Sequence, residues 1–249
     1  MAVAALEVPG KILTRSLFIM SNVTLITADM KMADIVHMNH NNLLIINRFN
    51  IPLGFGEQTI DEVCQKAYLP TNLFLMICNI HSNQKIKISE LDVPCCINKT
   101  IMFLRNAHNY YRKIRIPEIK RALVSLAKFY DKNIEKALSH FFNEYSSEVK
   151  KHLLFEENVL FPYILELSQN AEINTPKIKS EIYHQNIEDK LTDLKNIIIK
   201  YMSLPEHDMQ KIDLLDKLFH FQEDLDTHTL IEDLLLSPIV EQLEKNIQK

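Results

Sequence analysis

The sequence predicts an all-α protein, an up-down four-helix bundle preceded by a small three-helix module. Long stretches carry apolar residues three and four positions apart, which is the spacing of one helix face. Only three of the 249 residues are glycine, whereas β-sandwiches and phosphate-binding α/β folds use glycine at many turns. No paired-strand or hairpin pattern competes with the helical interpretation.

The first 29 residues, 1–29, have no sustained helical period, and we expect a poorly ordered extension. Its apolar patch is interrupted by Ser21, Asn22 and Thr24, which argues against a signal peptide. Met20 and Met30 are alternative starts of the chain.

Residues 30–83 are predicted to form the N-terminal helical module. Helical spacing runs from Met30 through Arg48, and the next segment must be a loop because it contains two of the three glycines. Thr59 with Glu62 three residues later is a capping-box pattern that opens a second helix. A third helix is expected to start at Pro70.

Residues 84–99 lack a sustained period and contain Pro94, so we interpret them as a linker. The bundle is expected at 100–249, where short connections between long amphipathic segments indicate antiparallel neighbours. Prolines 162 and 238 should end or kink two of the helices. The predicted bundle segments are 100–113 continued by 116–130, then 132–161, 176–202 and 208–236.

Composition narrows the class of protein. A net charge of −4 gives no basic surface for nucleic acid. Four cysteines in 249 residues do not form a disulfide scaffold, and we expect reduced thiols in a cytoplasmic protein. No apolar run reaches the roughly 18 residues of a membrane span.

A histidine is followed four residues later by a glutamate twice, as His152–Glu156 and His228–Glu232. Residues four apart share a helix face. One copy is a weak signal, because salt-bridged helix surfaces also produce it. Both copies, however, have a proline six residues after the glutamate, and this second coincidence favours a functional repeat.

Each predicted bundle helix carries a histidine on its expected inner face. The first two, His108 and His152, are 44 residues apart, and so are His184 and His228, which places them at comparable heights of the bundle. Taken singly, such histidines are more often ordinary core or surface residues. The candidate metal ligands are His108, His152, Glu156, His184, His228 and Glu232.

The expected burial of four histidines and two glutamates in one core needs a physical reason. Buried imidazoles and carboxylates are costly unless paired or metal-bound, and two close carboxylates repel unless a cation lies between them. Four nitrogen ligands and two bridging carboxylates suit two first-row metal ions, with iron favoured over a closed structural zinc site. The absence of His-Glu-x-x-His disfavours a zincin-type hydrolase. A metal-free helical bundle is the alternative.

On these residues, 100–249 resembles the hemerythrin-like (HHE) bundle, and 30–249 is similar to the di-iron iron–sulfur cluster repair family. The family pattern H-x-x-x-E-E-x-x-L-F-P is matched from His152 to Pro162, and a variant of it from His228 to Pro238. The single-histidine helices match at His108 and His184. Glu148, four residues before His152, matches a family acid expected beside the ligands.

The sequence also departs from the family. Tyr183 replaces an acid before the third-helix histidine. Gly54 and Phe55 stand where the N-terminal module of the family has paired cysteines, so the thiol chemistry attributed to that pair is absent.

The resemblance implies a non-haem centre with two Fe per chain that repairs, or supplies iron to, iron–sulfur clusters damaged by oxidative or nitrosative stress. The implied partners are damaged or apo iron–sulfur proteins and the small ligands O2 and NO, with no nucleic acid and no membrane. One alternative is a non-catalytic O2/NO-binding or redox-sensing protein, and another is iron storage. Whether the protein is an enzyme or a homodimer is left open.

Overall fold

The computed structural model describes residues 25–82, 93–169 and 184–247. Within these ranges the protein is built from helices with no β-strand, and one isolated backbone bridge joins Lys31 to Thr59. The predicted all-α class is confirmed. None of the helices in these ranges is long and apolar enough to cross a bilayer.

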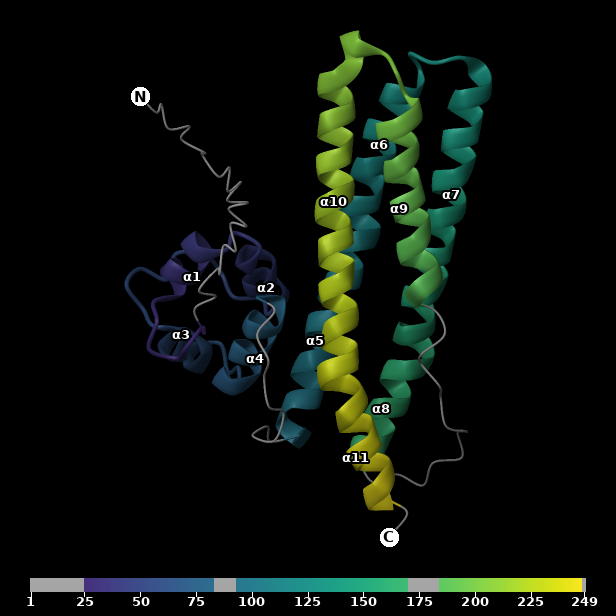
Figure 1. Cartoon of the computed structure of the whole chain (residues 1–249). Coiled ribbons are helices and arrows are strands. Elements are labelled where there is room, and N and C mark those ends of the chain that lie inside the picture. Colours follow the sequence, from purple (N-terminus) through teal and green to yellow (C-terminus); the bar gives the residue numbers. More distant parts are fainter. Residues whose placement is uncertain (1–24, 83–92, 170–183, 248–249) are drawn as a thin grey trace, which may run out of the picture.

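Four long helices run side by side and form the bundle (Figure 1). Helix α6 packs against α7 and α10, and α9 packs against the same two neighbours, so the four close into a ring. At the end nearer the C-terminus the bundle continues as α5, α8 and α11. The helices are α5 (Val93–Tyr110), α6 (Ile116–Ala127), α7 (Lys132–Phe155), α8 (Phe161–Ser168), α9 (His184–Tyr201), α10 (Asp208–Ile231) and α11 (Ser237–Ile247).

We call each long bundle helix, together with any helix that continues it, an arm. Among the described residues, three of the four arms contain one wide π turn each. These turns are η2 (Tyr111–Arg115), η3 (Glu156–Leu160) and η5 (Glu232–Leu236). After each turn a backbone N–H donates to the carbonyl five residues earlier, as Phe161 does to Glu156 and Ser237 to Glu232. The next residue is a proline in every case, which lacks an N–H and clashes with the carbonyl four residues back in a regular α-helix.

The π turns change two of the sequence predictions. Regular hydrogen bonding is interrupted before Pro162 and Pro238, as expected, but the chain resumes as α8 and α11 instead of ending. The prediction that the last helix stops at about residue 236 is therefore wrong. Such π turns occur often at functional sites, and two of these begin at a candidate ligand.

The N-terminal module contains four short helices and not three. They are α1 (Met32–Met38), α2 (Asn42–Arg48), α3 (Ile60–Lys66) and α4 (Thr71–His81). The expected single helix through Arg48 is broken because the Asn39 side chain accepts a hydrogen bond from the backbone N–H of Asn41. The capping box of Thr59 and Glu62 is present as predicted.

Two predicted boundaries also differ. Residues 25–29 of the expected loose extension are packed, because Ile26 is buried and its backbone exchanges two hydrogen bonds with the Asn79 side chain. Residues 93–99 of the expected linker belong to α5, since a proline at the second position of a helix costs no hydrogen bond. Residues 1–24 and 83–92 lie outside the described part of the chain.

The described cysteines Cys64 and Cys78 are buried free thiols. Cys96 is also buried. Burial raises the pKa of the Cys64 thiol to about 12, which keeps it protonated and unreactive.

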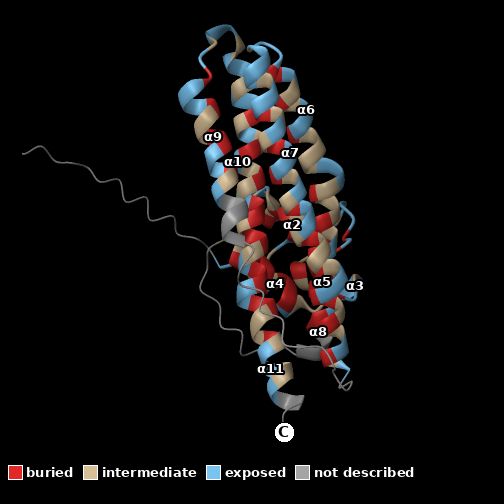
Figure 2. Ribbon diagram, turned by 90° about the vertical axis from the view of Figure 1, so that its right-hand side faces the viewer, coloured by how far each residue is buried: buried red, intermediate tan, exposed pale blue. Residues whose placement is uncertain are grey.

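Buried residues lie on the inner faces of the helices (Figure 2). The apolar residues among them fall into two clusters. One, which we call the module-side core, joins the N-terminal module to α5, α8 and α11 and contains Phe49, Phe74, Phe103 and Phe161. The other, the far core, fills the long part of the bundle and contains Phe142, Leu194 and Phe221. The module and one end of the bundle therefore share a core.

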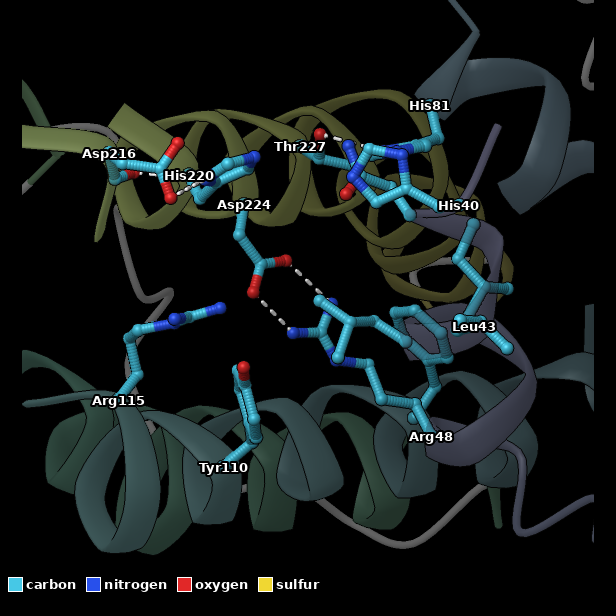
Figure 3. A pocket seen from close by; sticks show the side chains of 14 residues that line it. His40, Leu43, Arg48, His81, Tyr110, Arg115, Asp216, His220, Asp224 and Thr227 are labelled. Carbon is cyan, nitrogen blue, oxygen red and sulfur yellow. Dashed lines mark hydrogen bonds and ion pairs between the residues drawn. The ribbon is translucent and has the colours of Figure 1, made fainter. Parts of the chain in front are cut away.

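A buried ion pair reinforces this contact. Arg48 of α2 donates through Nη1 and Nη2 to the two carboxylate oxygens of Asp224 of α10, at 2.8 and 2.6 Å (Figure 3). The Tyr111 hydroxyl donates to the Asp224 carbonyl oxygen at 3.2 Å. The pair lies in a pocket of about 340 Å³ between module and bundle, which His81, Tyr110 and other side chains complete.

We predict that Arg48→Ala lowers the free energy of unfolding by roughly 3–5 kcal/mol, because it leaves the Asp224 carboxylate buried without its cation. The double variant Arg48→Met/Asp224→Leu should recover most of this loss. The control is Lys31→Ala, which removes an exposed pair with Glu57 and should leave stability nearly unchanged. Urea denaturation of the three variants decides the question, and equal losses for the two single variants would contradict the prediction.

Candidate metal centre

Four of the predicted ligands meet between the two cores. His108 lies near the end of α5 and His228 in the last turn of α10, while Glu156 and Glu232 open the π turns η3 and η5. Each offers one ligand atom, and these atoms all lie within 4.8 Å of one another. The four side chains are deeply buried, with residue exposures from 0 to 6%.

Glu156 is the centre of the group. Its Oε2 lies 3.1 Å from Nε2 of His108 and 3.9 Å from Nε2 of His228, and its Oε1 lies 2.9 Å from Nε2 of His152. A fifth predicted ligand therefore contacts the cluster through Glu156. Glu232 reaches His228 Nε2 through Oε1 at 3.1 Å.

The sixth predicted ligand, His184, is the first residue of α9. Its side chain lies outside the described part of the structure, as does Tyr183 before it. Helix α9 packs against α7 and α10, the two helices that carry the His-x3-Glu repeats.

The protonation of the group follows from its burial. Burial acts to raise the pKa of Glu156, but the neighbouring imidazoles of His108, His152 and His228 outweigh it and hold that pKa well below its usual range. Burial and the neighbouring Glu156 charge raise the pKa of Glu232 to about 7. Burial opposes the charge on His228, yet the two glutamates raise its pKa to about 10.

These residues fit a bound cation. Nε2 of His108 and Nε2 of His228 are only 3.3 Å apart, so a proton or a metal ion must lie between their lone pairs. Oε2 of Glu156 is buried and accepts no hydrogen bond from any described residue, despite the imidazole 3.1 Å away. Without metal, the raised pKa of His228 supplies a proton for the contact between the two imidazole nitrogens. The donor set, imidazole nitrogens and carboxylate oxygens, is one that iron and zinc share.

A carboxylate outside the predicted ligand set, that of Glu157, also contacts the cluster. Glu157 Oε1 lies 3.0 Å from Nδ1 of His108, and Arg112 of η2 donates to both oxygens of Glu157 at 3.0 and 3.2 Å. Its position directly after Glu156 in the H-x-x-x-E-E pattern was the only available signal. Glu148, the acid expected beside the ligands, has a partly exposed carboxylate that accepts a hydrogen bond from the Lys190 ammonium.

The chain was compared with known protein families. The hemerythrin HHE cation-binding domain matches residues 101–240. The chain belongs to this family. The matched hemerythrin region begins in α5, ends in α11 and contains all the candidate ligands. A comparison with curated proteins found no match.

The family match leaves the N-terminal module of this hemerythrin-like protein outside its limits. The resemblance of 30–83 to the cluster repair family therefore depends on sequence motifs alone. At Gly54, where that family has the first of its paired cysteines, φ is +103°, and residues with a side chain are strained in this conformation.

The raised pKa of Glu232 leads to a prediction for the metal-free protein. A carboxyl group whose pKa rises from 4.5 to about 7 on folding stabilises the fold at low pH, and this contribution is lost as pH increases through 7. Glu232→Gln cannot titrate, so its thermal stability should change less than that of the wild type between pH 5 and 8. Melting curves in the presence of a chelator measure this. Parallel pH profiles of the two proteins would contradict it.

Proposed function

We propose that the buried cluster holds two iron ions per chain, bound by His108, His152, Glu156, His184, His228 and Glu232. The observation that supports the proposal is the buried layer of imidazole nitrogens and carboxylate oxygens, in a family whose domain is named for cation binding. The carboxylates of Glu156 and Glu232 are buried with their ligand atoms within 4.8 Å of each other. Balancing their two negative charges needs more positive charge than one imidazolium supplies.

The chain's own residues would hold the metal and control access to it. Glu156 is placed to bridge, because its two oxygens face different histidines. Phe161 stacks on the His108 ring at 5.6 Å and Tyr111 meets the His228 ring edge-on at 5.8 Å, which excludes water from the ligands. Bound iron would supply redox chemistry and open positions for O2 or NO.

For the biological role, we propose repair of iron–sulfur clusters, or iron supply to them, under oxidative or nitrosative stress. The support is the position of the N-terminal module. It packs on the end of the bundle that carries the cluster, and Arg48 binds α10 at Asp224, one turn before His228. A client protein that engages the module would therefore act on a helix that carries a ligand. Damaged or apo iron–sulfur proteins in the cytoplasm are the proposed clients.

A second function, reversible O2 or NO binding as a sensor, is favoured by a different observation. The described ligands are almost fully enclosed, and enclosure retains iron through many cycles of ligand binding. Repair requires the opposite, because iron must leave the protein.

We predict about two irons per chain after purification under iron-replete conditions. His152→Ala and Glu232→Ala should each lose iron, because they remove a ligand and leave buried partners unpaired. Metal analysis and the visible absorption of a carboxylate-bridged centre measure this. His140→Ala, which removes an exposed histidine paired with Glu144 on α7, is the matched control. One tightly held zinc and no iron in the wild type would contradict the proposal.

Repair and sensing are separated by the fate of the iron. We predict that reduced protein loaded with labelled iron transfers it to an apo iron–sulfur acceptor faster than free iron does, with a chelator competition as control. Restoration of the activity of a damaged cluster enzyme should follow. Transfer no faster than from free iron, together with rapid reversible NO binding, would favour the sensor.

A further inference from the structure

We infer that Glu157 is a positioning residue that fixes the tautomer and orientation of His108 for metal binding, and that Arg112 holds Glu157 in place. The inference rests on the proposed metal site. It assigns a role to a carboxylate that would not itself contact the metal.

The argument begins with the proton of the His108 ring. Neutral imidazole carries one N–H, and a carboxylate only accepts hydrogen bonds. Nδ1 of His108 lies 3.0 Å from Glu157 Oε1 in hydrogen-bonding geometry. A bare Nδ1 would place two lone pairs against each other, so the proton belongs on Nδ1. Nε2, on the cluster side of the ring, is then left as the lone pair that a metal requires.

The Glu157 carboxylate is itself held in place by a side chain of another arm. Arg112 donates to both of its oxygens, and the two side chains are about four-fifths buried, with exposures of 24 and 20%. The planar guanidinium fixes the carboxylate plane as well as its charge. Arg112 belongs to η2 and Glu157 to η3, so two π turns of different arms supply the parts that orient one ligand.

The corresponding atom of His228 differs. Its Nδ1 is buried and has no hydrogen-bond partner among the described residues. Of these two histidines, only His108 therefore has its far ring nitrogen fixed by a described side chain.

The experiment uses the full chain in four forms: wild type, Glu157→Leu, Glu157→Gln and the control Glu144→Gln. Glu144 is a suitable control because it is an exposed glutamate of the same arm, paired with the exposed His140. Ferrous iron affinity is measured by competition with a chelator. In metal-free protein, the 15N shifts of His108 report which ring nitrogen carries the proton.

We expect Nδ1–H in the wild type and a shift toward Nε2–H in Glu157→Leu, with iron affinity lowered roughly 10–100-fold. Glu157→Gln keeps an acceptor oxygen and should lose less affinity, and it tests the inference if the leucine variant fails to fold. Glu144→Gln should bind iron like the wild type.

An Nε2–H tautomer in the wild type would overturn the inference. So would an iron affinity of Glu157→Leu equal to that of the Glu144 control, or a Glu157→Gln loss as large as that of the leucine variant. If the wild type bound no iron, the proposed function would fail, while the tautomer comparison would still decide the role of Glu157.

Discussion

A layer of buried charge separates the two apolar cores, and the surrounding structure is arranged to make that layer tolerable. Carboxylates are rarely buried at all, and here Glu156 and Glu232 face each other within a cluster whose ligand atoms span 4.8 Å. Three features of the structure offset the free-energy cost of burying these carboxylates. Imidazoles surround Glu156, a proton remains on Glu232 or His228 when no metal is bound, and Glu157 with Arg112 forms a neutral pair beside His108. Bound metal would replace the proton with a higher charge.

The N-terminal module is connected to this layer through α10. The Arg48–Asp224 pair is one helical turn from His228, and Tyr111 contacts both, donating to the Asp224 carbonyl and meeting the His228 ring edge-on. Breaking a buried pair is expensive, so the position of the module and the position of the ligand helix depend on each other.

Periodicity predicted the helical class, and spacing brought His108, Glu156, His228 and Glu232 into one predicted set, four residues that the structure places together. The errors arose where the deciding partner is distant in sequence or where local rules allow two outcomes. In the sequence Pro94 indicates a linker, although the first turn of a helix tolerates proline. Pro162 predicts an end or a kink of its helix, and local rules do not show that a π turn carries the chain on into another helix. The contact that Glu157 makes cannot be predicted from local sequence, because its partner Arg112 is 45 residues away on another arm.

The division of the apolar interior has a consequence for how the molecule opens. Contiguous cores tend to unfold as cooperative units, and the module-side core and the far core are two such units. The His/Glu layer is their common border, with ligands contributed from helices that continue into both. Metal bound there would join the two units into one, so that neither end opens without releasing ligands. Amide protection would then report iron occupancy along the whole length of the bundle and not only near the site.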